Sequence, residues 1–210
     1  MEFPVLGYLS FISFFIPAII GSARWRVINR QMKIFACYCI GSSVFTGIEF
    51  ILAKQKIQNH YFININYLME LVMINLFYYS AVVNARLKRA ILWGSIAFAV
   101  YWIYDNIVCI NREGINELTA TISKGIMIIT SVFLVVDRLG KIKAPLTDSS
   151  VFWVAAAVIL YCSGSIFILA FSNTLMKLDL QYFVMVWNIN WGLVIVSNML
   201  FAGSFFQKYL

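Results

Sequence analysis

The chain has 210 residues, of which 62% are hydrophobic and only 12% are charged, whereas a soluble globular domain usually carries about 25% charged residues. The charges lie in short clusters between long apolar runs, so the net charge of +7 is typical of membrane orientation signals and excludes a nucleic-acid footprint. The composition therefore predicts an all-α, polytopic membrane helix bundle that forms a single domain over residues 1–210.

Seven apolar segments follow one another along the chain, each near the roughly 20 residues that cross a bilayer as a helix. They are Phe3–Ser22, Met32–Ala53, Phe62–Ala85, Arg89–Val108, Glu117–Val136, Ser150–Asn173 and Leu180–Phe206. The C-terminal end of the fourth segment is not defined by the sequence, because residues 105–117 are polar. They form either the end of this segment or a re-entrant or interfacial turn. The connections are short, so we expect no soluble domain.

The basic residues predict the orientation of the bundle. With the N-terminus outside, the first, third and fifth loops and the C-terminus hold 11 basic residues and the outer loops hold 4. The inner group is Arg24, Arg26, Arg30, Lys33, Arg86, Lys88, Arg89, Arg138, Lys141, Lys143 and Lys208, and the outer group is Lys54, Lys56, Arg112 and Lys177. This positive-inside bias predicts a bundle with the N-terminus out and the C-terminus in.

One alternative would leave six helices. Residues 21–23 (Gly-Ser-Ala) have the small-residue pattern of a signal-peptidase site after an apolar run. A secretory signal, however, carries its basic residues before the apolar run, and here they come after it.

The cysteines and the single histidine predict neither a disulfide framework nor a metal site. Cys37, Cys39 and Cys162 fall within apolar segments, whereas Cys109 lies near the predicted outer surface. No CxxC or Cys/His ligand spacing is present, and His60 is in an outer loop. We therefore expect no metal, no cofactor and no histidine-based catalytic triad.

Ionisable residues inside the segments are the strongest functional signal. Each costs about 2.5–3.5 kcal/mol at the bilayer centre, so it is expected to face the bundle interior and to have a partner. The predicted topology places Glu49, Glu70, Asp105 and Lys124 in the outer half, with Glu117 at a segment edge. Lys124 is predicted to pair with either Glu70 or Asp105.

Helical periodicity, at about 100° per residue, groups the polar residues into inward-facing stripes. The third segment carries Asn66, Tyr67, Glu70, Ile74, Phe77, Ala81 and Asn84 on one stripe, and the fifth carries Glu117, Ala120, Thr121, Lys124, Ile128 and Ser131. The fourth places Tyr101, Trp102 and Asp105 together, and the seventh carries Trp187, Asn190, Trp191, Val194, Ser197 and Asn198. Asn188 lies nearly opposite Asn190 on this helix, so the two amides cannot hydrogen-bond to the same neighbouring helix.

Two interpretations of these polar residues remain open. In the first, they line a pocket open to the outside, and the candidates for ligand binding or proton relay are Glu70, Lys124, Asp105, Glu49, Tyr67, Asn190, Trp187, Trp191 and Asn198. In the second, they are structural bonds between helices, each contributing about 0.6 kcal/mol, and the tryptophans are packing or interfacial anchors. The small residues Gly47 and Gly164 are expected to permit close approach of helices.

The C-terminal third resembles a family of small bacterial seven-helix membrane proteins. The resemblance lies in Phe152-Trp153, in residues 161–167 (Tyr-Cys-Ser-Gly-Ser-Ile-Phe), in Trp187-Asn188-Ile189-Asn190 and in Asn198. Members of that family have about this length and carry an acidic residue in the third helix, as Glu70 does here. The resemblance implies the seven-helix topology and a bacterial inner-membrane location. It carries over no catalytic residue, because the family is of uncharacterised function.

Two familiar seven-helix classes fit poorly. Retinal binding needs a lysine midway along the seventh helix, and this helix has none before Lys208 at its end. Small carriers with a 3+1+3 arrangement have proline-broken helices and parallel repeats. This chain has only three prolines and no evident repeat between residues 1–85 and 117–206.

The sequence therefore predicts a receptor-like or accessory membrane protein that binds a small ligand, a lipid or a partner through the outer polar cluster. Its partners would be the bilayer and a membrane or signalling protein. The alternative is a proton-coupled or substrate transporter that uses Glu70 and Lys124. An intramembrane enzyme ranks last, because no nucleophile–base spacing or metal-ligand set is present.

Overall fold

The computed structural model describes residues 4–108, 116–139 and 145–207, and this part of the chain is helical with no β-strand. The helices are α1 (Val5–Ser13), α2 (Phe15–Ala23), α3 (Arg30–Lys54), α4 (His60–Ala81), α5 (Ala85–Ile103), α6 (Glu117–Leu139), α7 (Ser150–Ala170), α8 (Ser172–Leu175) and α9 (Leu180–Ser204). A π-helical turn η1 (Tyr104–Val108) extends α5, and a 3-10 turn η2 (Leu146–Asp148) precedes α7. The predicted all-α class is confirmed. Phe3, Cys109, Arg112, Lys141, Lys143 and Lys208 lie outside the described residues.

Six helical stretches within the described residues are long and apolar enough to cross a membrane. They are Val5–Ala23, Arg30–Lys54, Ala85–Ile107, Glu117–Leu139, Ser150–Ala170 and Gln181–Ser204. Helix α4, which corresponds to the predicted third span, is not among them although it has 22 residues. Its apolar run is interrupted by Asn64, Asn66, Glu70 and Asn75. The chain is thus a membrane-type helix bundle, and α4 is a long helix in which polar residues divide the apolar run.

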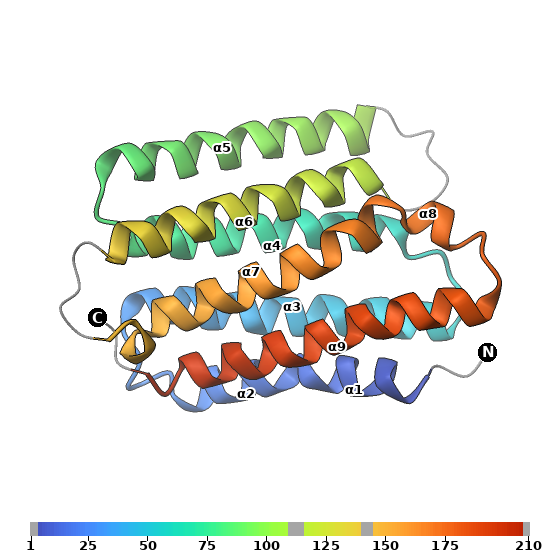
Figure 1. Cartoon of the computed structure of the whole chain (residues 1–210), viewed down its shortest axis with the longest axis horizontal. Coiled ribbons are helices and arrows are strands. Elements are labelled where there is room, and N and C mark those ends of the chain that lie inside the picture. Colours follow the sequence, from blue (N-terminus) through green and yellow to red (C-terminus); the bar gives the residue numbers. More distant parts are fainter. Residues whose placement is uncertain (1–3, 109–115, 140–144, 208–210) are drawn as a thin grey trace.

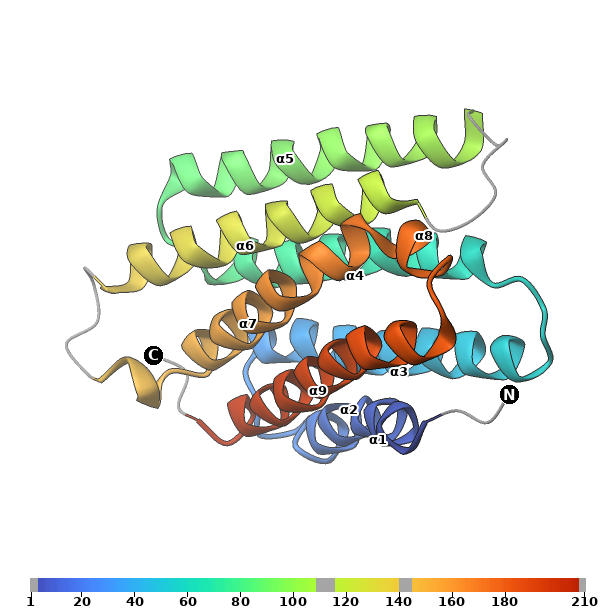
Figure 2. The same cartoon turned by 45° about the vertical axis from the view of Figure 1, so that its right-hand side comes forward.

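Contacts between neighbouring helices close a ring (Figures 1 and 2). Helix α3 packs against α4, α4 against α6, α6 against α7, α7 against α9, and α9 against α1 and α2, while α2 returns to α3. Helix α5 lies outside this ring and packs against α4 and α6. We call the end at which α1 begins and α3 ends the N-terminal end of the bundle, and the other the C-terminal end (Figure 1).

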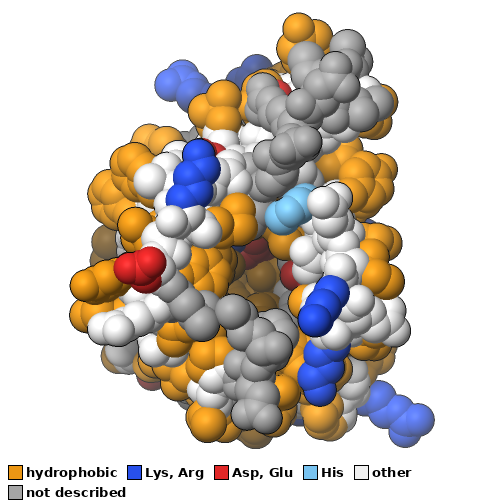
Figure 3. Space-filling model, turned by 90° about the vertical axis from the view of Figure 1, so that its right-hand side faces the viewer, with side chains coloured by type: hydrophobic (Ala, Val, Ile, Leu, Met, Phe, Trp, Pro, Cys, Tyr) orange, Lys and Arg blue, Asp and Glu red, His pale blue; other side chains and the backbone are white. Residues whose placement is uncertain are grey.

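Aromatic side chains fill the ring toward its C-terminal end. The ring of Phe35, a fully buried residue near the start of α3, lies 5.1 Å from Phe201, 5.5 Å from Phe205 and 5.4 Å from Phe77, measured between ring centres. These contacts join α3 directly to α9 across the interior of the ring. The N-terminal end is different: Figure 3 shows it hollowed at its centre, with acidic side-chain atoms visible inside the hollow.

The first apolar segment is divided into α1 and α2, and Pro17 explains the division. Proline has no N–H to donate to the carbonyl of residue 13, and its ring crowds that turn of the helix. Neighbouring helices supply polar contacts at the break: Ser43 Oγ of α3 donates to the Phe14 carbonyl at 2.8 Å, and Asn198 Nδ2 of α9 donates to Ser13 Oγ at 2.8 Å. Such bonds make a broken helix tolerable in hydrocarbon.

Small residues behave differently at the two positions where close approach was predicted. A Cβ atom at Gly164 would overlap the side chain of Leu193 in α9, so the predicted close approach is confirmed there. At Gly47 a Cβ atom would meet nothing within 4 Å, so the prediction is wrong for that residue. An unanticipated close approach occurs at Gly21 of α2, where a Cβ atom would lie 2.8 Å from the Phe205 ring and 3.1 Å from the Ala36 Cβ.

The two glycines give a matched test of the packing. Gly21→Ala should lower the free energy of unfolding by about 1–3 kcal/mol, because Phe205 and Ala36 are buried and must shift. Gly47→Ala should be neutral or slightly stabilising, because alanine is the better helix former. Unfolding in mixed detergent micelles measures both. Equal stability of the two variants would contradict the packing of α2 against α3 and α9.

Candidate functional site

The centre of the ring holds a buried ion pair between α4 and α6. Lys124 Nζ lies 2.5 Å from Glu70 Oε2; the lysine side chain is inaccessible, and the glutamate side chain is 11% exposed. Both residues lie on the stripes that periodicity predicted. Of the two partners predicted for Lys124, the structure therefore selects Glu70.

Aromatic rings complete the surroundings of the lysine. Lys124 Nζ lies 4.2 Å from the centre of the Tyr161 ring of α7 and 5.7 Å from that of Tyr67 of α4. The electron-rich faces of these rings attract the ammonium group. Tyr67 was a predicted site residue. Tyr161 was not, although it begins the segment that carries the family resemblance.

A cavity of about 40 Å³ lies beside the ion pair, and this is room for a few water molecules. Its lining residues come from the α1–α2 break and from α3, α4, α7 and α9. They are Phe14, Tyr38, Ser42, Asn66, Glu70, Tyr161, Val194, Ser197, Asn198 and Phe201. The structure thus brings the predicted residues Glu70 and Asn198 to one cavity. The α3 residues were missed, because no charged side chain marks that part of the helix.

Asp105 lies outside the ring, in the π-helical turn η1. Its Oδ2 accepts hydrogen bonds from Thr119 Oγ1 at 2.9 Å, from the Tyr101 hydroxyl at 3.3 Å and from Asn116 Nδ2. The alternative prediction that Asp105 pairs with Lys124 is therefore wrong. With three donors around it, this carboxylate joins η1 to the start of α6.

Glu117, at the first turn of α6, also has a structural role. Its Oε1 accepts from the Asn173 backbone N–H at 2.5 Å and from Ser172 Oγ at 3.5 Å. These bonds attach the short helix α8 to α6.

Glu49 of α3 lies next to the cavity. Its carboxylate lies close to Asn66 and interacts electrostatically with Glu70, and both of these residues line the cavity. One of its oxygens, Oε1, is buried without a hydrogen-bond partner. Residue 49 is two helical turns from Ser42, so the two share one face of α3.

The predicted residues of α9 divide into two groups. Asn198 reaches the cavity, and Asn190, two turns away on the same face, is 8% exposed and has a buried Oδ1 without a donor. Trp187 and Trp191 are half-buried neighbours with ring centres 6.5 Å apart. Neither tryptophan lines the cavity, so the structure does not bring them to the ion pair.

Polar contacts between α4 and α6 continue past the ion pair toward the C-terminal end. Thr130 Oγ1 donates to Asn75 Oδ1 at 3.1 Å, and the Tyr78 and Ser131 hydroxyls lie 2.6 Å apart. Asn75 Nδ2 in turn donates to Ser95 Oγ of α5 at 2.9 Å. The sequence-based prediction placed the polar groups in one half of the bundle only. These contacts reach into the other half, so the prediction was incomplete.

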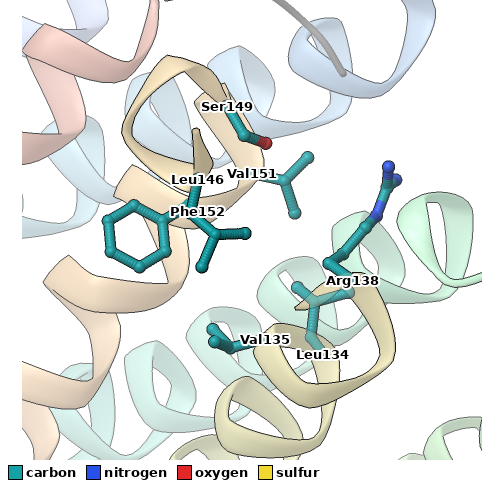
Figure 4. Close-up of a pocket in the computed structure, with 7 residues that line it drawn as sticks. All are labelled: Leu134, Val135, Arg138, Leu146, Ser149, Val151 and Phe152. Atoms are coloured by element: carbon teal, nitrogen blue, oxygen red, sulfur yellow. The ribbon is translucent and has the colours of Figure 1, made fainter. Parts of the chain in front are cut away.

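A second, smaller pocket of about 10 Å³ lies at the C-terminal end of the bundle. Figure 4 shows its lining residues, which are Leu134, Val135, Arg138, Leu146, Ser149, Val151 and Phe152. The Arg138 guanidinium donates to the Ala81 carbonyl at 2.6 Å. A space of this size holds no more than about one water molecule, so it is a packing gap rather than a ligand site.

Comparison with known proteins adds no further evidence: no family model, curated protein or solved structure matches the chain. Among the described residues, no group of three His, Cys, Asp or Glu side chains is placed to hold a metal ion. The chemistry that the site offers is hydrogen bonding and charge, in a cavity walled by aromatic rings.

A double-mutant cycle tests the ion pair. Glu70→Leu or Lys124→Met alone should each lower the free energy of unfolding by about 3–5 kcal/mol, because the remaining charge is left buried without a partner. The double variant should recover most of that loss, because it buries no charge. Unfolding in mixed micelles gives the coupling energy. Strictly additive losses would show that the two charges do not interact.

Proposed function

We propose that the chain is a seven-span protein of the bacterial inner membrane that binds a small polar ligand in the cavity beside Glu70 and Lys124. In this proposal it acts as a receptor-like or accessory protein. The observation that carries the proposal is the cavity itself: five parts of the ring converge on it, and a carboxylate forms part of its wall.

The distribution of hydrogen-bond partners supports ligand binding over a purely structural role. Asp105, Glu117 and Asn75 each accept bonds from neighbouring helices or turns, as structural residues do. On the inward faces of α3 and α9, by contrast, Glu49 Oε1 and Asn190 Oδ1 are buried without donors. Buried polar groups without partners are costly, and a bound molecule can supply what they lack.

We infer that α4 also crosses the membrane. Its 22 residues give a length of about 33 Å, which matches the roughly 30 Å of hydrocarbon. Its most polar residues are buried: Glu70 pairs with α6, and Asn75 bonds to α5 and α6. With α4 included, the chain has seven spans, and the basic residues then favour the N-terminus outside and the C-terminus inside.

A ligand in the cavity would be able to act on the rest of the bundle. Phe14, at the break between α1 and α2, lines the cavity, and Asn198 joins the cavity to Ser13. Occupancy would therefore change the contacts that fix the bend of the first segment. Lipid-facing helices could pass this change to a partner membrane or signalling protein.

One observation favours the transporter alternative. The polar contacts between α4 and α6 continue beyond the ion pair through Asn75, Thr130, Tyr78 and Ser131, and a proton pathway requires such a sequence of groups. A transporter would carry protons or substrate down an imposed gradient in proteoliposomes, and Glu70→Gln would stop it. A binding protein would show no flux.

The topology makes a prediction at the two ends of α4. In a chain without its native cysteines, Gln58→Cys should react with a membrane-impermeant maleimide from outside the cell. Val83→Cys should react only after the membrane is opened, because both residues are exposed and lie at opposite ends of the helix. Labelling of both residues from the same side would show that α4 does not cross.

The cavity makes a prediction about binding. Small polar molecules that enter it should raise the unfolding temperature of the detergent-solubilised protein. Glu70→Gln keeps the shape of the side chain but removes its charge, and it should lose this response. Glu117→Gln changes a carboxylate outside the cavity and should keep it. If no compound from a panel of small amines, alcohols, amides, sugars and carboxylates stabilises the protein, the proposed function fails.

A further inference from the structure

The charges and hydrogen-bonding groups around the cavity indicate which kind of molecule it takes. Resting on the proposed function, we infer that the ligand is a small organic cation, a protonated amine, whose N–H groups bind the carboxylates of Glu49 and Glu70. The inference depends on the charge balance of the ring interior, on its excess of acceptors and on the nature of the cavity wall.

Two carboxyl groups, Glu49 and Glu70, and one ammonium group, Lys124, lie close together around the cavity. Glu70 and Lys124 neutralise each other at 2.5 Å, which leaves Glu49 as an additional carboxylate. Among the described residues no lysine or arginine forms an ion pair with Glu49; Lys54, one turn further along α3, lies instead over the rings of Tyr8 and Phe50. A half-buried carboxylate without a counter-charge is unfavourable when ionised, so a cationic ligand would stabilise its ionised form.

The same region has acceptors without donors. Glu49 Oε1 and Asn190 Oδ1 are both buried and unpartnered, and Asn190 is only 8% exposed. The Lys124 ammonium group is already engaged by Glu70 and by the Tyr161 ring. An ammonium ion carries several N–H donors and no acceptor, so it supplies the donors that Glu49 and Asn190 lack. The buried Trp187 Nε1, one turn from Asn190, is a donor without a partner and needs an acceptor instead.

Asn66 relates the position of Glu49 to the cavity. Its side chain lies close to the Glu49 carboxylate, and it lines the cavity together with Glu70, one helical turn away. Glu49 lies two turns from Ser42 on α3, and Asn190 two turns from Ser197 on α9, and both of those residues line the cavity. The acceptors therefore lie on the cavity-lining faces of their helices, toward the N-terminal end of the bundle, where α3 ends and α9 begins (Figure 1).

The walls and the volume restrict the cation further. Tyr38, Tyr161, Phe14 and Phe201 contribute to the lining, and aromatic surfaces favour organic cations. The volume of about 40 Å³ admits only a few non-hydrogen atoms. Ethanolammonium is a suitable probe of this size, since it combines one ammonium group with one hydroxyl group.

A charge series on a constant frame tests the inference. Ethanolammonium chloride, ethylene glycol and sodium glycolate share a two-carbon skeleton with a hydroxyl group at one end. The other end is an ammonium group, a second hydroxyl group or a carboxylate, so the three carry positive, no and negative charge. Each is added to the purified wild-type chain at equal ionic strength, with sodium chloride as the blank. The inference expects only ethanolammonium to raise the unfolding temperature. This comparison needs no variant, so it stands even if a substitution prevents folding.

Two isosteric variants then locate the site. Glu49→Gln should weaken ethanolammonium binding by about tenfold or more, because it removes the counter-charge. Asp179→Asn removes the same charge from an exposed position before α9 and should leave the affinity unchanged. Equal affinity of wild type and Glu49→Gln would overturn the role of Glu49.

The remaining outcomes separate the two proposals. If glycol or glycolate stabilises the chain and Glu70→Gln removes the effect, the cavity binds a ligand but the inferred cation is wrong. Stabilisation by sodium chloride equal to that by ethanolammonium would also overturn the amine, in favour of an alkali ion. If no probe binds, the amine is excluded, and the wider panel described above decides whether the cavity binds anything.

Discussion

The ion pair between Glu70 and Lys124 is the constraint on which the arrangement of the bundle depends. Two charges cannot face hydrocarbon, so the faces of α4 and α6 that carry them must be covered. Inside the ring Tyr161 covers the ammonium group. Outside the ring α5 covers the seam between α4 and α6: Trp102 Nε1 donates to the Asn64 carbonyl at 2.8 Å, and Ser95 bonds to Asn75. The peripheral position of α5 is therefore explained by the polar character of α4.

The polar side chains fall into two populations that have different consequences. Those along α4, α5 and α6 are paired with one another, and they hold three helices together. Those on α3 and α9 surround a cavity, and two of them, Glu49 and Asn190, have atoms without partners. The bonds of the first population form within the fold. In the second population two atoms have no partner in the protein, and this difference distinguishes the cavity from the structural seam.

Periodicity predicted the buried faces well because each face is a property of a single helix. Glu70, Lys124 and Asn198 could be identified in this way. The partner of Lys124 could not, because it depends on η1, whose π-helical turn directs Asp105 to Thr119 and away from the ring. The roles of Thr130 and Ser131 were equally hidden, since hydroxyl groups in helices can bond to their own backbone. Gly47 shows the same limit: a small residue permits close packing but does not require it.

The aromatic cluster at the C-terminal end of the ring bears on the choice between binding and transport. Phe35 and Phe77 are fully buried, and Phe201 and Phe205 pack against Phe35 from α9. A substrate that reached the cavity from the hollowed end would meet this cluster directly beyond Tyr38, which contacts both Phe35 and Phe201. To release the substrate on the other side, the ring contacts that join Phe35 and Tyr38 of α3 to Phe201 of α9 would have to separate. Access from one end and an apolar plug at the other favour a protein that binds its ligand and returns it to the same side.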